Sequence, residues 1–249
     1  MHNEIEIREC TTIGEFSECV QIQREVFALP EIELSPVRHL VVTKNAGGFS
    51  LGAWDGKRLA GFTLSVPAYI NGRPAFYSHM TAIRPEYQSL GLGARMKWVQ
   101  RERALSEGID YIRWTFEPVK ARNAYFNLEK LGAVTRDYRA NFYGTDYGTA
   151  RDLEGKRLGL DSDRLMADWE LRDPRVEALA AGERQVASVD RPKAEIVTVN
   201  DWFQLVEEDV ENARSELLRI RGEFQSAFAR GLVARGFRRD AESPVFLLY

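Results

Sequence analysis

The amino-acid sequence has few cysteines, no long apolar run and no surplus of basic residues. Its two cysteines, Cys10 and Cys19, do not have the spacing of metal ligands. No apolar run approaches the roughly 20 residues of a membrane-spanning helix, and the N-terminal MHNEIEIREC lacks a signal-peptide pattern. The 34 basic residues are outnumbered by 37 acidic ones, which argues against nucleic-acid binding. We therefore expect a cytoplasmic protein with reduced thiols, no metal, no membrane contact and no nucleic-acid partner.

The chain does have the apolar residues for a large folded core. Of its 249 residues, 44% are hydrophobic and 11% are aromatic, which excludes a disordered or fibrous protein. This length allows one large domain or two small ones. Neither short repeats nor low-complexity segments interrupt the chain.

The first 90 residues predict a strand, two helices and three further strands. Residues 4–8 alternate like a strand, and residues 12–28 follow a helical period. The apolar face of that helix holds Ile13, Phe16, Val20 and Phe27. Ser35 and Pro36 resemble an N-cap and a first-turn proline, which would open a short helix that runs to residue 44. Three strands follow at residues 49–54, 58–66 and 75–83, with turns at Asp55-Gly56 and Asn71-Gly72.

From residue 91 onwards, helices and strands alternate. The pattern predicts helices at residues 91–107 and 120–131 and strands at residues 109–116, 133–143 and 163–171. An antiparallel meander therefore runs into a strand–helix–strand–helix–strand unit. This order predicts an α/β (α+β) fold, with a mixed, mostly antiparallel sheet and helices on both faces.

The composition changes near residues 173–194, which we expect to be a connector. The domain organisation predicted is thus a main domain at 1–172, this connector, and a strand–helix–hairpin extension at 195–249, packed on the same domain. The extension's helix, residues 201–230, carries an apolar seam of Phe203, Val206, Val210, Ala213, Leu217, Ile220, Phe224 and Ala227. Such a seam either packs on the chain's own sheet or pairs with a second copy, which would make a homodimer.

A glycine-containing loop, Gln88-x-x-Gly91-x-Gly93, stands between a predicted strand and a predicted helix. Glycines let the backbone approach a ligand, and a helix N-terminus offers unpaired N–H groups and the positive end of the helix dipole. Phosphate is the anion most often found at such a position. A Walker loop would need Gly-Lys-Ser/Thr, which is absent. A dinucleotide-binding loop would need a third glycine, where Met96 stands.

The surroundings of this loop resemble the GNAT superfamily of acyl-CoA-dependent N-acyltransferases. The resemblance covers residues 4–171 and rests on a strand that ends at residues 81–85, the loop, an amphipathic helix, the strand IDYIRWTF, and a helix that ends Glu129-Lys130-Leu131-Gly132. In that superfamily a Q/R-x-x-G-x-G/A loop wraps the pyrophosphate of coenzyme A. The resemblance implies acetyl-CoA or succinyl-CoA as co-substrate. The residues implied to bind it are Ala82, Ile83, Gln88, Leu90, Gly91, Leu92, Gly93, Ala94, Asn123 and Asn127.

The C-terminal part resembles a poorly characterised bacterial branch of the superfamily. Some members of that branch are linked to N-acylamino-acid racemases and transfer succinyl from succinyl-CoA to amino acids. The resemblance therefore implies an acetyl or succinyl transfer to a small amine, with an amino acid as the favoured acceptor. A fold alone does not decide the function.

An amine must be neutral to attack a thioester, so a general base is expected. His79 is the first candidate, because histidine titrates in the useful range and aralkylamine acetyltransferases of the superfamily have a catalytic histidine at the matching place. Sequence parity puts it on one strand face with Thr81 and Ile83. Tyr77 on the same strand is a candidate proton relay, and Glu117 ends the next strand. Alternatively, His79 is satisfied by its neighbours and Glu117 is a solvated or capping carboxylate.

One position departs from the pattern of the superfamily. Many members have a tyrosine four residues before the final glycine of the Leu-Gly step, where it protonates the leaving thiolate. Leu128 occupies that position here. Tyr125 lies one turn earlier and Tyr143 ends the following strand, and neither matches the pattern. The alternative to an enzyme is therefore a non-catalytic acyl-CoA-binding protein with the GNAT fold.

Arginines near the predicted site suit a carboxylate on the acceptor or on a succinyl donor, because guanidinium binds carboxylate with two N–H groups. The candidates are Arg38, Arg84, Arg113 and Arg122; solvation at the surface is the alternative for each. Arg113 is favoured because it interrupts an apolar strand. Both cysteines are far from the glycine loop in sequence and have no evident base. We therefore expect direct transfer in a ternary complex.

Overall fold

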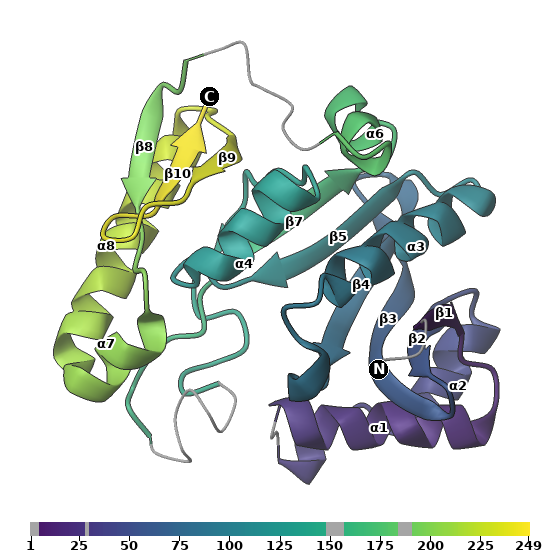
Figure 1. The fold of residues 1–249 in the computed structure, drawn as a ribbon. Coiled ribbons are helices and arrows are strands. Elements are labelled where there is room, and N and C mark those ends of the chain that lie inside the picture. The colour runs from purple at the N-terminus through teal and green to yellow at the C-terminus, as the bar shows by residue number, and fades with distance from the viewer. Residues whose placement is uncertain (1–4, 28–29, 148–156, 184–190) are drawn as a thin grey trace. The chain divides into compact units, whose positions relative to one another are not determined.

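The structure is a computed structural model that describes residues 5–27, 30–147, 157–183 and 191–249. The chain divides into two compact units, residues 1–113 and 114–249. Strand β5 (Tyr111–Phe116) crosses the border between them. Figure 1 shows the order of the elements along the chain, and each unit is described by itself.

The first unit is built on a meander of strands, which the sequence predicted. Its strands are β1 (Glu6–Glu9), β2 (Phe49–Asp55), β3 (Arg58–Ile70) and β4 (Arg73–Ile83), in the order β1-β2-β3-β4-β5. Successive pairs from β1 to β4 are antiparallel, whereas β4 and β5 are parallel. The β3–β4 turn takes Asn71 at φ 52° and Gly72 at φ 80°, the left-handed pair that a two-residue hairpin requires.

Three helices cover this sheet on its two faces. They are α1 (Ile13–Phe27), α2 (Val37–Asn45) and α3 (Leu92–Ser106), with short 3₁₀ turns η1 (Glu31–Glu33) and η2 (Pro85–Tyr87). Phe16, Leu40 and Leu64 share one apolar cluster beneath α1 and α2. The neighbouring residue Ser65 instead accepts a hydrogen bond from Gln100 of α3. Adjacent residues of a strand point to opposite faces, so α3 lies on the face opposite α1 and α2.

Two local expectations in this unit are wrong. Ile13 begins α1 and is 61% exposed, because the first turn extends beyond the sheet that buries Phe16. Ser35 is not the N-cap of α2, which is Pro36 with no side-chain cap. The backbone N–H and C=O of Ser35 are instead bound by the Gln23 side chain at 2.8 and 3.1 Å.

In the second unit, β5 is followed by α4 (Ala121–Tyr125), the π-helix η3 (Phe126–Lys130), β6 (Tyr138–Arg139) and β7 (Arg164–Glu170), in the strand order β5-β7-β6. The strand expected at 133–143 shortens to β6 and two isolated bridges, at Val134 and Thr135. It ends because Asn141 turns the chain at φ 47°. A left-handed residue does not continue a strand.

The predicted C-terminal extension is present as a second sheet with helices. Its elements are β8 (Ala194–Val197), α7 (Trp202–Glu208), α8 (Val210–Ala229), β9 (Ala234–Arg238) and β10 (Val245–Leu248), with the antiparallel strand order β8-β10-β9. The expected connector contains α6 (Pro174–Ala180), and its residues 184–190 lie outside the described residues. The domain boundaries at 172 and 195 stay a prediction.

The long helix expected at 201–230 is two helices. Asp209 has extended dihedrals, φ −153° and ψ 91°, and its carboxylate accepts the Asn212 N–H at 2.9 Å. It therefore ends α7 and caps α8. Most of the apolar seam is buried within the single chain, where Phe224 packs against Phe246 of β10 and Tyr138 of β6. This burial supports packing on the chain's own sheet; Phe203 is the exception, at 41% exposed.

Among the described residues, no helix is both long enough and apolar enough to cross a membrane.

Removing the Asp209 cap tests the break between α7 and α8. Asp209→Ala is expected to lower the free energy of unfolding by about 1 kcal/mol, because the first turn of α8 loses an acceptor for a backbone N–H. Urea unfolding measures the loss, and Asp209→Ser, which retains an acceptor oxygen, is the matched control. Equal stability of Asp209→Ala and wild type would show that the carboxylate does not cap α8.

Candidate functional site

The glycine loop leads from the end of β4 into α3. Gly91 is the N-cap of α3 in the left-handed conformation at φ 74°, and the Arg95 N–H makes the first helical bond to its carbonyl at 3.1 Å. The N–H groups of Leu92, Gly93 and Ala94 therefore belong to the first turn, which has no preceding carbonyls to bind within the helix. A Cβ placed on Gly91 or Gly93 would meet no atom within 4 Å. The start of α3 thus has open space in front of it.

Two side chains before the glycines bind the loop to the sheet. The Gln88 side chain donates to the Ile83 carbonyl at 2.9 Å, and the Tyr87 hydroxyl donates to Asp55 at 2.9 Å. Leu90 is 56% exposed at the tip. Ala82 and Ile83 pair with Phe62 and Gly61 of β3. Within the first unit, β5 pairs with β4 only at Phe76 and Tyr77, further towards the start of β4.

A β-bulge in β4 decides where His79 points. Leu64 pairs with Met80 and the next residue, Ser65, pairs with Ser78, so that His79 is the extra residue of β4. Ile83 packs with residues of α3, whereas His79 contacts the α2 side. The shared parity expected for His79, Thr81 and Ile83 is therefore wrong, because a bulge inverts the alternation of a strand.

The imidazole of His79 lies among polar groups at the start of α2. Its Nε2 is 3.3 Å from the Ser35 hydroxyl, and its ring centroid is 6.0 Å from that of His39. His79 is exposed as a residue, but the protein around the ring partly desolvates it. This desolvation and the charge of His39 lower the pKa of His79 below its usual 6.5. The ring is therefore neutral at neutral pH and able to accept a proton.

Tyr77 shares a sheet face with His79. Its partner on β3 is Val66, which packs against the apolar cluster beneath α1 and α2. Directly opposed residues of antiparallel strands point to the same face. The structure therefore brings Tyr77 and His79 to one side of the sheet, together with Ser35 and His39.

In the second unit, Glu117 at the end of β5 is a charged group with fixed partners. Lys120 Nζ lies 3.2 Å and Arg164 Nη2 lies 3.6 Å from its carboxylate. Burial would raise the pKa of Glu117, but these two cations outweigh that effect and lower it to about 2. A carboxylate with so low a pKa is a weak proton acceptor, so the contribution of Glu117 is charge rather than proton transfer.

The helix that follows Glu117 carries the two predicted asparagines. The Asn123 amide is 3.5 Å from the Glu117 carboxylate. Asn127 lies in the π-helix η3, where its Oδ1 accepts the Trp114 indole N–H at 3.1 Å. Leu128 has no exposed surface and is part of the core. Two cations lie near the ring of Tyr125, with Lys130 Nζ 5.5 Å and Arg239 Cζ 4.2 Å from its centroid.

The arginines predicted near the site differ in their surroundings. Arg84 is buried, donates to the Leu59 carbonyl at 2.8 Å and forms an ion pair with Glu25 of α1. These bonds make Arg84 a structural residue of the first unit rather than one that binds the carboxylate of a substrate. Arg113 is partly buried over Tyr111, at 5.7 Å from the ring centroid. Arg38 and Arg122 are exposed.

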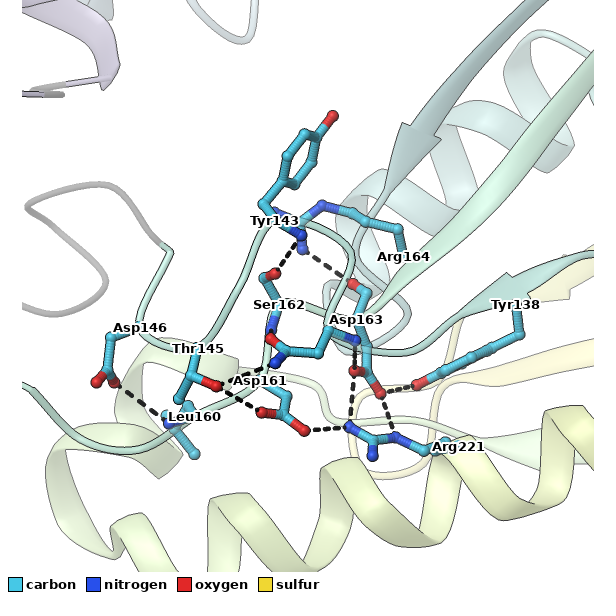
Figure 2. A network of polar contacts seen from close by, with 11 residues as sticks. Tyr138, Tyr143, Thr145, Asp146, Leu160, Asp161, Ser162, Asp163, Arg164 and Arg221 are labelled. Carbon is cyan, nitrogen blue, oxygen red and sulfur yellow. Dashed lines mark hydrogen bonds and ion pairs between the residues drawn. The ribbon is translucent and has the colours of Figure 1, made fainter. Parts of the chain in front are cut away.

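A polar network lies beside Glu117 (Figure 2), and the sequence did not predict it. The guanidinium of Arg221, on α8, donates to both Asp161 and Asp163 at 2.8 Å, and Tyr138 also donates to Asp163. Asp163 is completely buried. Asp161, Asp163 and Arg164 line a cavity of about 50 Å³, together with Glu117, Lys120 and Trp202. The only sequence signal was the Asp-Ser-Asp run at 161–163, which has no partner until the chain folds.

The two cysteines are free and buried, with their sulfur atoms 3.9 Å apart. The hydrogen bond between them and the burial of Cys19 raise the pKa of that thiol. A buried thiol of raised pKa is a poor nucleophile. The described part of the chain contains no group of three or more His, Cys, Asp or Glu residues arranged to hold a metal ion.

Comparison with known proteins identifies the fold. No family model and no curated protein matches the sequence. A GNAT-family protein from Desulfovibrio desulfuricans matches with TM-score 0.54 and 13% identity, over 68% of this chain and 99% of that one. The ribosomal-protein-S18-alanine N-acetyltransferase from Escherichia coli matches with TM-score 0.52 and 15% identity, over 67% and 93%. A GNAT-family acetyltransferase from Streptococcus pneumoniae matches with TM-score 0.52 and 16% identity, over 66% of this chain and 98% of that one. The chain has the GNAT fold, as its sequence predicted.

The ion pairs of Glu117 predict a pH-dependent stability. Its folded pKa of about 2 is below the usual 4.5, so its contribution is complete above pH 4.5 and is lost as the pH falls towards 2. Glu117→Gln is expected to lower the free energy of unfolding by about 2–3 kcal/mol at pH 7 and by much less at pH 3.

Urea unfolding at both pH values measures this difference. The exposed Glu207 provides the matched control, and Glu207→Gln should cost little at either pH. A cost for Glu117→Gln that is the same at pH 7 and pH 3 would contradict the ion pairing.

Proposed function

We propose that the protein is an acyl-CoA-dependent N-acyltransferase that acts on a small amine. The observation that carries this proposal is the start of α3, where a left-handed Gly91 cap and an uncovered first turn meet open space. Backbone N–H groups at a helix N-terminus suit a pyrophosphate. The GNAT fold supports the resemblance, which implies coenzyme A binding at this loop.

The proposed donor is acetyl-CoA or succinyl-CoA. The N–H groups of residues 90–94 would hold the pyrophosphate, and the backbone of Ala82 and Ile83 would pair with the pantetheine arm. Asn123 and Asn127 would bind the same arm. The Oδ1 atom of Asn127 already accepts from Trp114, which leaves its amide N–H groups as the donors for the arm.

His79 is the proposed general base. In this proposal Nε2 carries the ring hydrogen and donates it to the Ser35 hydroxyl, 3.3 Å away, and Nδ1 carries the lone pair that takes the proton of the amine. The amine nitrogen bonds to the thioester carbonyl carbon as the carbon–sulfur bond breaks, and coenzyme A departs as a thiolate. The lowered pKa of His79 keeps the ring neutral before this step. Tyr77, on the same face, is the proposed relay for the proton through water.

The acid for the thiolate is Tyr125 in this proposal, because the buried Leu128 has no proton to give. Transfer is direct, within a ternary complex, since both cysteines are buried. An amino acid is the favoured acceptor, and Arg113 is the proposed contact for its carboxylate. The succinyl donor, the homodimer, the cytoplasmic location and the link to racemases stay predictions.

The second candidate is a non-catalytic acyl-CoA-binding protein. Leu128, in place of the tyrosine of the superfamily, favours it. The lowered pKa of His79, which suits a general base, favours the enzyme. Both candidates require the same loop to bind coenzyme A, so binding and turnover need separate tests.

Binding is tested by thermal melting with coenzyme A, acetyl-CoA and succinyl-CoA at equal concentrations. A ligand at about 100 times its dissociation constant adds about 2.7 kcal/mol of stability, and the melting temperature should rise. Gly93→Leu fills the open space at the loop and should abolish the shift. Gly222 of α8 has equally open surroundings, so Gly222→Leu is the matched control and should preserve it.

A shift that survives Gly93→Leu would place the ligand elsewhere. No shift with any of the three ligands would refute the proposed function.

Catalysis is tested at His79. His79→Gln is expected to lower kcat by a factor of about 10²–10⁴, as the loss of a general base does, while the melting shift with acetyl-CoA stays. His39→Gln removes a charge that lowers the pKa of His79, so the acid limb of its pH–rate profile should move to higher pH. Steady-state thiol release measures both. An unchanged kcat in His79→Gln would exclude it as the base.

A further inference from the structure

The bulge at His79 lies over a buried polar cluster on the opposite face of the sheet. Ser65 of β3 and Ser78 of β4 are directly paired and buried, at 0% and 4% exposed. Gln100 of α3 donates to Ser65 Oγ at 2.7 Å and to Ser78 Oγ at 3.0 Å. Lys97, one turn earlier on α3, donates from Nζ to Ser78 Oγ at 2.8 Å. Gln100 therefore joins the two strands at the pair next to the bulge, and Lys97 binds the β4 member of that pair.

This cluster distinguishes between the two registers that β3 and β4 have available. Without the bulge, Ser65 would face His79, and Ser78 would turn to the apolar face beneath α1 and α2. A shift of one residue moves every side chain to the other face. Ser78 would then lose Lys97 and Gln100, and the imidazole of His79 would lie against the Lys97 ammonium. The loss of these buried hydrogen bonds disfavours that register.

We propose that Lys97 and Gln100 are positioning residues for His79. By binding Ser78 they hold the bulged register of β4, which turns the imidazole of His79 to the α2 side and against Ser35. They touch neither the donor nor the acceptor and act only through the strand. The part of this inference that concerns catalysis rests on the proposed function, whereas the part that concerns the orientation of His79 does not.

The cost of burying Lys97 supports this role. The side chain is 4% exposed, and desolvation lowers its pKa to about 7. A buried lysine is destabilising unless its ammonium is well bound. An apolar side chain of the same length would pack the same space without that cost. The bond from Nζ to Ser78 is a contact that binds the ammonium at this point.

The test compares Lys97→Met, which retains the length of the side chain, with Lys57→Met at an exposed turn. The sequence has only three histidines, so imidazole NMR signals are few, and His79→Gln assigns the signal of His79. Lys97→Met is expected to shift the His79 signal and to change its titration, in which His39 and Ser35 are the polar groups that face the ring. It should also lower kcat about tenfold to a hundredfold, as displacement of a reacting group does, with little change in KM for acetyl-CoA.

Ser78→Ala removes the same hydrogen bond from the strand side. It should reproduce the effects of Lys97→Met, and the effects of the double variant should be less than additive, because the two residues share a bond. Lys97→Gln, which keeps an N–H donor, should recover part of the kcat. If Lys97→Met does not fold, the same measurements on Ser78→Ala test whether this hydrogen bond positions His79.

A His79 signal and a kcat that match those of Lys57→Met would overturn the proposal. So would effects of Lys97→Met and Ser78→Ala that simply add. If wild type releases no thiol with any amine, the proposed function fails. The NMR comparison then still confirms or refutes the positioning of His79.

Discussion

The pairing of β3 with β4 is the constraint on which the candidate site depends. Side chains alternate along a strand, so one extra residue in β4 moves everything before it to the opposite face. Before that residue, Ser78 faces α3 while Tyr77 faces α1 and α2. After it, Ile83 packs with α3 and the chain enters the glycine loop. A regular strand with the same sequence would have put His79 against Lys97 of α3.

Two acidic groups of the second unit are in contact with cations. Glu117 has two cationic neighbours, and Asp163 is bound by Arg221 and Tyr138 (Figure 2). The cations beside Glu117 lower its pKa to about 2, so Glu117 keeps its charge over a wide pH range. His79 differs from Glu117, since desolvation and the charge of His39 lower its pKa and favour the neutral ring. This difference in pKa favours His79 over Glu117 as the proposed general base.

The sequence predicted most elements of the fold because their signals are local. Helical periods, the Asn71-Gly72 turn and the glycine before α3 each act within a few residues. The predictions for His79 and Ser35 were wrong because contacts with residues distant in sequence determine their conformation. His79 lies in a bulge that the neighbouring sequence does not predict. The backbone of Ser35 is hydrogen-bonded to the Gln23 side chain, and Ser35 does not cap a helix. The break at Asp209 had a local signal, a capping residue, that the continuous apolar period concealed.

The candidate site was predictable to a smaller extent than the fold. The glycine loop has a local motif, and the structure has the open helix start that the motif requires. The Asp161–Asp163–Arg221 network joins residues about 60 positions apart, as the separations of its bonds show. No spacing rule predicts such a contact. Leu128 was recognised from the sequence as a departure from the superfamily, and its complete burial gives it a place in the core.

The measurement that tests the central claim most directly is thiol release from acetyl-CoA and succinyl-CoA with a broad panel of amines, including amino acids of both chiralities. The account predicts release that depends on both the amine and the protein, well above the hydrolysis seen without amine. It also predicts an acylated amine in equal amount to the thiol released. Acyl-CoA binding without amine-dependent release across the whole panel would contradict the account and leave a binding protein with the GNAT fold.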